Sequence, residues 1–164
     1  MVLFLFWRRF IVLRISRLTD YGTLVLAHLS SDMDRLLSAA DVAAATGINV
    51  PTVSKLLKLL GKAKLVTSTR GSQGGYRLSR AASEISAADI IDALEGPVSI
   101  TECSATDSHC DYESVCNVGG AWQRINVAIR RALDDINLSD LQRTRAPVPQ
   151  FEFAGMPISV ERKE

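Results

Sequence analysis

Apolar side chains recur every three or four positions early in the chain, the spacing of a helix that buries one stripe. The clearest stripe predicts a helix over 17–30 and consists of Leu18, Tyr21, Val25 and Leu29. A short alanine-rich helix is predicted over 39–46, with Ser38 as its N-cap and Gly47 at its end. Two helices thus precede the segment in which apolar and basic residues are separated onto opposite faces.

A third helix is predicted from Asn49 to about 61, with Pro51 in its first turn. Its apolar residues share one face: Val53, Leu56, Leu57 and Leu60. Its polar and basic residues lie mostly on the other: Thr52, Ser54, Lys55, Lys58 and Lys62. The pattern predicts a helix with a buried back and a basic front, joined to the helix before it by a tight turn.

After the third helix the pattern predicts first short strands and then further helices. Two short strands are expected within 67–79, around the loop RGSQGG, where Gly71, Gly74 and Gly75 permit the positive φ angles that a hairpin loop needs. A fourth helix is predicted over 86–94. A longer one follows over 120–136, with a stripe typical of helix–helix packing: Trp122, Ile125, Ile129, Leu133 and Ile136.

These elements indicate a mainly α-helical fold with a small β-hairpin wing, that is, a winged helix-turn-helix joined to a long dimerisation helix. The predicted organisation is an N-terminal extension (1–12), a DNA-binding domain (13–80), a connecting helix (81–100), a cysteine-rich loop (101–118), a dimerisation helix (119–138) and a mobile tail (139–164).

Charge is distributed very unevenly between the two halves of the 164-residue chain. The net charge is only +1, yet residues 1–80 hold 12 Lys and Arg against 4 Asp and Glu, whereas residues 81–164 hold 7 against 14. From 51 to 80 there are seven basic residues and no acidic one. A solvated face normally mixes signs, so this segment is expected to face a polyanion.

Composition and cysteine use exclude several classes of protein. A chain that is 47% hydrophobic and 23% charged is globular rather than disordered. The opening run MVLFLFW is broken by Arg8 and Arg9, short of the roughly 20 apolar residues of a spanning helix. The sequence therefore predicts a cytoplasmic protein with no membrane partner, and its three cysteines fit a reducing compartment better than a disulfide framework.

The basic segment predicts binding to double-stranded DNA. Thr52, Ser54 and Lys55 are placed to reach base edges in a major groove, and Lys58 and Lys62 to meet phosphates. Arg70 at the wing tip has the reach to enter a minor groove. The rest of the wing completes the predicted interface: Ser72, Gln73, Gly74, Gly75 and Arg77.

Three cysteines within 14 residues form the second candidate site. Cys103, Cys110 and Cys116 are spaced to wrap an iron-sulfur cluster or a zinc ion, and either needs a fourth ligand. His109 is the local candidate, although its neighbour Cys110 points elsewhere in most backbone geometries. On the residues alone zinc and a cluster stay equally open, and unliganded thiols are the third alternative. A thiol enzyme that uses Cys110 with His109, or Cys103 with a carboxylate, is not expected, and neither is a small-molecule substrate. Adjacent side chains rarely face one another, and no nucleophile elbow or phosphate loop is present.

Together, these segments resemble the Rrf2 type of bacterial regulators, which includes the IscR, NsrR and RirA repressors. The resemblance covers about 13–138 and is carried by LRISRLTDYGTLVLAHL (13–29), ATGINVPTVSKLLKLLGKAKLV (45–66), RGSQGGYRL (70–78) and the three-cysteine loop. It implies a homodimer that crosses through the long helix, and a 2Fe-2S or 4Fe-4S cluster at the three cysteines that controls DNA binding. The opening and the wing are most similar to regulators of SUF iron-sulfur assembly, which implies a repressor of assembly genes. Nitric oxide or iron sensing within the same family, and a zinc-stabilised module without sensing, are the alternatives.

One departure from this resemblance concerns the fourth ligand. IscR-like members with a 2Fe-2S cluster have a histidine three residues after the last cysteine, where this chain has Gly119. NsrR-like members take an acid from the first helix of the partner subunit, and the matching residue here is Asp20. The alternative for Asp20 is an acid in the first turn, favoured by the helix dipole alone. His28 is expected to be a surface or packing residue.

Overall fold

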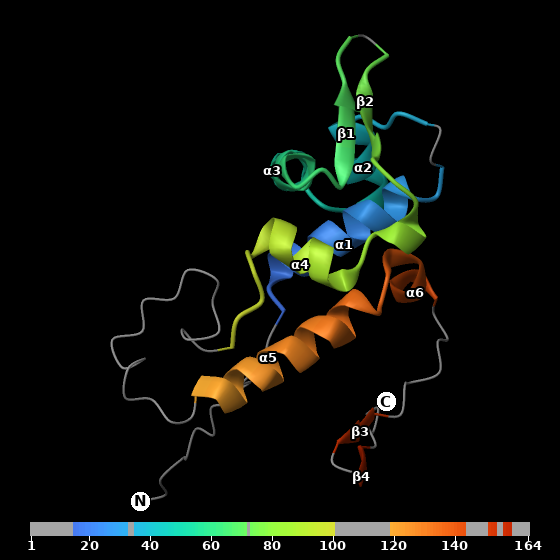
Figure 1. The fold of residues 1–164 in the computed structure, drawn as a ribbon. Coiled ribbons are helices and arrows are strands. Elements are labelled where there is room, and N and C mark those ends of the chain that lie inside the picture. Colours follow the sequence, from blue (N-terminus) through green and yellow to red (C-terminus); the bar gives the residue numbers. More distant parts are fainter. Residues whose placement is uncertain are drawn as a thin grey trace, which may run out of the picture.

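The computed structural model describes residues 15–32, 35–71, 73–100, 119–143, 151–153 and 156–158. Its elements are α1 (Arg17–Leu29), α2 (Ala39–Thr46), α3 (Val50–Lys62), β1 (Val66–Thr69), β2 (Gly75–Leu78), the 3₁₀ turn η1 (Ala82–Glu84), α4 (Ala87–Leu94), α5 (Gly119–Asp134), α6 (Leu138–Gln142), β3 (Phe151–Phe153) and β4 (Met156–Ile158). The predicted class, helices with one small wing, is confirmed. Figure 1 shows the β1–β2 hairpin projecting from the helices at one end and α5 crossing the other end.

Each helix of the DNA-binding part begins at a side chain that accepts a backbone N–H, because the first turn of a helix leaves its own donors unpaired. Ser16 caps α1, Ser38 caps α2 in a capping box with Asp41, and Asn49 caps α3. Gly47 ends α2 with φ +72°, a left-handed conformation that glycine adopts without a Cβ clash. These signals explain why the predicted bounds agree closely with the observed ones.

One hydrophobic core joins the helices to the base of the hairpin. Val25, Leu26 and Leu29 of α1 meet the buried face of α3, while Val66 and Leu78 close the core from the hairpin. The α3 residues Val53, Leu56, Leu57 and Leu60 are all fully buried, as the sequence pattern predicts. The basic front of α3 is thereby held outward.

The C-terminal part differs from the predicted mobile tail. Residues 139–142 belong to α6, which Asn137 begins in a capping box with Asp140, and Leu138 is fully buried against the core. Farther along, β3 pairs antiparallel with β4. The sequence pattern missed α6 because the helix is only five residues long and buries a single leucine. No helix among the described residues is long and apolar enough to cross a membrane.

Candidate DNA interface and cysteine segment

The outward face of α3 carries the basic side chains that the sequence predicted. Lys55, Lys58 and Lys62 are exposed, and Thr52 and Ser54 are half-buried beside them. Asn49 holds the start of the helix through a 2.9 Å hydrogen bond from the Thr52 backbone N–H to its side-chain oxygen. A rigid helix of this kind can place a short row of polar and basic side chains at the floor of a major groove.

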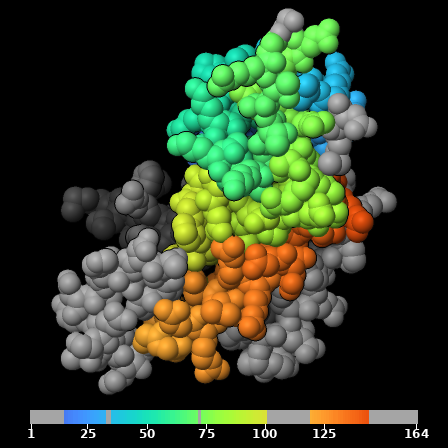
Figure 2. Space-filling model, turned by 45° about the horizontal axis from the view of Figure 1, so that its top comes forward, coloured from blue at the N-terminus to red at the C-terminus, as the bar shows by residue number. Residues whose placement is uncertain are grey.

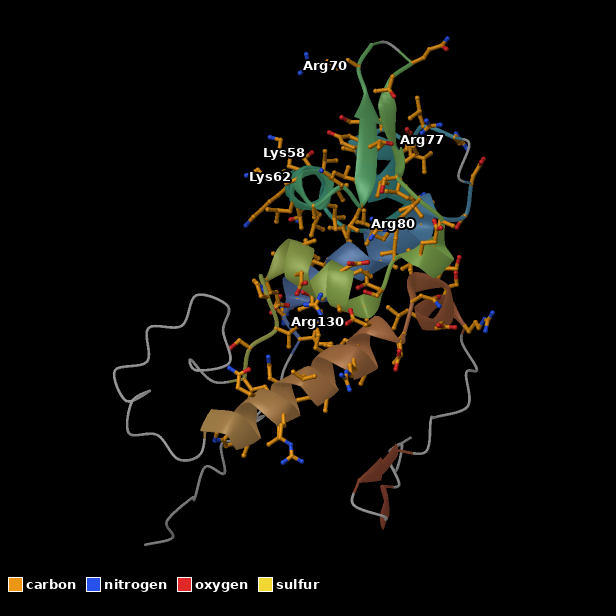
Figure 3. All side chains as sticks on the ribbon, in the orientation of Figure 1. Lys58, Lys62, Arg70, Arg77, Arg80 and Arg130 are labelled. Carbon is orange, nitrogen blue, oxygen red and sulfur yellow. The ribbon has the colours of Figure 1, made fainter. Side chains whose placement is uncertain are left out.

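The wing is a two-stranded antiparallel ladder in which Val66 pairs with Leu78 and Ser68 with Tyr76. Arg70 and Gln73 are exposed at its tip, and Ser72 lies outside the described residues. Figure 3 shows Arg70, Lys58 and Lys62 extending to the same side of the molecule, whereas Arg77 extends to the other side of the hairpin. Lys58, Lys62 and Arg70 therefore share one side of the molecule, and Arg77 lies apart from them.

Not every basic residue of this segment is available to a polyanion. The Arg80 guanidinium forms a 2.8 Å ion pair with Asp89 of α4 and donates a 2.9 Å hydrogen bond to the Glu84 carbonyl oxygen. Arg80 thus fastens the end of the wing to the connecting helix. Because Glu84 and Asp89 lie outside 51–80, the excess of basic residues in that segment did not predict this role for Arg80.

The wing glycines have roles that differ from the predicted one. Gly71 has φ +118°, as a hairpin loop requires, but Gly74 and Gly75 do not adopt positive φ. A Cβ on Gly74 would lie 2.3 Å from the Thr69 carbonyl oxygen, and a Cβ on Gly75 would lie 2.8 Å from that of Leu37. These two positions need glycine because other backbone passes too close. Gly75 is buried, where the wing packs closely against the backbone of Leu37.

The cysteine site lies outside the described residues, which end at 100 and resume at 119. Cys103, Cys110 and Cys116 therefore stay predictions, as does His109. Among the residues that are described, no group of three or more His, Cys, Asp or Glu side chains is placed to hold a metal ion. Asp20, the predicted fourth ligand, is exposed on α1, beside a groove between α1 and α6 that Leu24 and Leu141 also line.

The residue at which the chain leaves α4 for the cysteine segment is tied to the start of α1. The Glu95 carboxylate accepts a 3.1 Å hydrogen bond from the Ser16 backbone N–H and another from the Thr19 hydroxyl. The Thr19 hydrogen bond, with help from Ser16, holds the pKa of Glu95 below its usual value. Glu95 therefore ties the end of α4 to the start of the helix that bears Asp20. Ser16 and Glu95 are 79 positions apart in the sequence, so no local pattern reveals this contact.

Helix α5 leaves several of its apolar side chains partly exposed. None of its 16 residues is buried, and Trp122 and Ile125 remain 40% and 39% exposed. Farther along, Arg130 binds Asp92 of α4 at 2.6 Å, and this contact raises the pKa of Arg130. In Figure 2 α5 (orange) runs along the base of the molecule, away from the wing. The first half of α5 thus carries apolar side chains that remain partly exposed in the described part of the chain.

This arrangement of an outward basic helix beside a hairpin on a helical core defines a winged helix-turn-helix DNA-binding protein. The model of the Rrf2 family, described as iron-dependent transcriptional regulators, matches residues 15–144. The chain belongs to this family. The protein Rrf2 of Nitratidesulfovibrio vulgaris is 31% identical over 139 residues, which cover 84% of this chain and 93% of the relative.

Solved structures have the same fold. CymR (YrzC), the global cysteine regulator of B. subtilis, is 29% identical with a TM-score of 0.61, and the match covers 82% of this chain and 99% of CymR. IscR of T. potens is 27% identical with a TM-score of 0.59, and the match covers 83% of this chain and 94% of IscR. The family and these matches identify a DNA-binding transcriptional regulator.

Proposed function

We propose that this protein is a homodimeric transcriptional repressor of SUF iron-sulfur assembly genes, whose DNA affinity depends on an iron-sulfur cluster. The observation that carries the proposal is the pairing of an outward basic front at α3 and the wing with three closely spaced cysteines that follow α4 in the sequence. The first part suits DNA, and the second suits a regulatory metal group.

The DNA contacts divide by position. Thr52, Ser54 and Lys55 read base edges in the major groove, and Lys58 and Lys62 contact phosphates. The exposed Arg70 enters a minor groove, with the other wing-tip residues beside it. Two copies related by a two-fold axis contact half-sites about 34 Å apart, one turn of the double helix.

The apolar stripe of α5 supports a homodimer. Exposed aromatic and aliphatic side chains on one helix face are typical of a surface that another helix covers. In the dimer, Trp122 and Ile125 of one subunit pack on the partner subunit, which buries the area that a single chain leaves in water.

The available donors fit an iron-sulfur cluster. Cys103, Cys110 and Cys116 supply three thiolates, and the exposed carboxylate of Asp20 supplies a weaker oxygen ligand from the partner subunit. A cluster bound there would be removed by oxidants and by iron shortage. Because Glu95 is hydrogen-bonded to the start of α1, a shift of the cysteine segment is passed to the DNA-binding helices.

The test is an absorbance spectrum with iron and sulfide analysis on protein purified without oxygen, for the wild type and for Asp20→Ala. Visible absorbance with iron and acid-labile sulfide, lost when any one cysteine becomes serine, supports the proposal. Loss of absorbance in Asp20→Ala identifies the fourth ligand. A colourless protein that contains one zinc ion per chain refutes cluster sensing and leaves a zinc-stabilised DNA-binding module.

A further inference from the structure

Arg80 connects the wing to the segment that begins α4. It lies two positions after the end of β2, and Figure 3 shows it at the base of the hairpin whose tip carries Arg70. Its guanidinium donates a 2.9 Å hydrogen bond from Nε to the Glu84 carbonyl oxygen and a 2.8 Å hydrogen bond from Nη2 to the Asp89 carboxylate. Arg80 therefore contacts both ends of the short segment 84–89.

This segment, 84–89, is itself held in place from two sides. The Asp89 carboxylate accepts a second hydrogen bond, at 3.1 Å from the Ser86 backbone N–H, in the capping box that begins α4. From the other side, the Leu138 backbone N–H donates a 2.8 Å hydrogen bond to the Ile85 carbonyl oxygen, and both of these residues are fully buried. The segment is thus a fixed platform beneath the wing.

A small tilt of the hairpin moves its tip by a large distance. Arg70 lies four positions beyond Val66, the first residue of β1, and the rise of a strand makes that about 13 Å. A tilt of about 10° at the base therefore moves the backbone of Arg70 by roughly 2 Å, which exceeds the window of about 0.5 Å in hydrogen-bond distances. The direction of the wing decides whether Arg70 reaches its target.

The contacts at the base of the wing differ in what they fix. Backbone hydrogen bonds of 3.0 and 2.8 Å between Leu37 and Tyr76 hold one edge of β2. Arg80 holds the end of the hairpin through a planar group whose donors bond to two separate acceptors, so it fixes a direction as well as a distance. The side chains of Arg80 and Asp89 are 33% and 36% exposed, and an ion pair so open to solvent contributes orientation more than stability.

We propose that Arg80 is a positioning residue for DNA recognition, which sets the angle of the wing on the segment 84–89 and so places Arg70 in the minor groove. Arg80 contacts no DNA itself. The inference rests on the DNA docking proposed above and adds to it a residue that lies outside its contacts. Helix α3 is held by its own fully buried face, so the phosphate contact of Lys58 does not depend on Arg80.

The experiment breaks the ion pair from each side. Arg80→Met keeps the apolar stem and removes the donors, and Asp89→Ala removes the acceptor. Asp140→Ala is the matched control, because Asp140 also closes a capping box and pairs with an arginine, Arg143, but belongs to α6, away from the wing. Circular dichroism of each variant verifies its fold.

Each of these variants is combined in turn with Arg70→Ala and with Lys58→Ala. The Kd is measured on a duplex that the wild type selects from a random pool. In the wild-type background, Arg70→Ala should weaken binding by about 10-fold. In Arg80→Met and in Asp89→Ala, that penalty should shrink by at least about 3-fold, a coupling typical of residues that act together.

The penalty of Lys58→Ala should stay within about 2-fold of its wild-type value in every background, and Asp140→Ala should change neither penalty. The proposal is overturned if folded Arg80→Met and Asp89→Ala keep the full Arg70 penalty, since Arg80 is then only a stabilising contact. It is also overturned if the Lys58 penalty shrinks equally, or if Asp140→Ala has the same effect. A wild type that selects no duplex would instead refute the docking itself.

Discussion

Gly75 gives the sharpest test of how the wing is held. An alanine Cβ would lie 2.8 Å from the Leu37 carbonyl oxygen and 2.9 Å from its carbonyl carbon and its nitrogen, where ordinary contact begins at 3.4 Å. All three are backbone atoms, so no side chain can rotate away. The two segments must separate by roughly 0.5 Å, which strains both hydrogen bonds between Leu37 and Tyr76, at 3.0 and 2.8 Å.

We expect Gly75→Ala to lower the free energy of unfolding by about 2–4 kcal/mol, from overpacking and from two weakened backbone hydrogen bonds. Urea unfolding at fixed protein concentration measures this, with an unchanged m-value as evidence that only stability has changed. Gly61→Ala is the matched control, since its Cβ has room and helix propensity favours alanine by up to about 1 kcal/mol. Equal stability of the two variants would refute the close approach.

Three further predictions concern charge and assembly. The pKa of Glu95 is lowered, so the stabilisation that its carboxylate provides is present at neutral pH and is lost as the pH falls through the acid range. Glu95→Gln should therefore lower the free energy of unfolding at pH 7 by up to about 1 kcal/mol. A difference from the wild type that persists at pH 3 would contradict this. Lys58→Ala should weaken binding to specific and to random DNA alike and should reduce the slope of log K against log salt concentration by about 0.9. Arg70→Ala should instead change the sequence preference. Identical binding profiles of the two variants would refute the division of roles. Ile125→Glu should give monomers by light scattering, while a dimer that survives would exclude this face of α5 as the interface.

Local signals made the DNA-binding half predictable. Ser38, Gly47 and Asn49 are caps that act on their own helices, and the apolar stripe of α3 specifies its buried face without reference to the rest of the fold. The hairpin loop carried its own glycine signal, although only Gly71 uses it in the expected way. Where the determinants lie within a few residues of each other, the sequence is sufficient.

Long-range pairings were beyond the sequence pattern. Nothing near Glu95 indicates that it reaches Ser16, and nothing near Arg80 indicates Asp89 as its partner. Such contacts depend on the tertiary arrangement rather than on periodicity.

Control of DNA binding by the cysteine segment is tested most directly by one comparison. The Kd for operator DNA is measured without oxygen on protein as purified and on the same preparation after its iron is removed, with Cys110→Ser treated in the same way. We predict at least a 10-fold difference between the two forms of the wild type and none for Cys110→Ser. Equal affinities of the two wild-type forms would contradict cluster control and leave a DNA-binding regulator that responds to another signal.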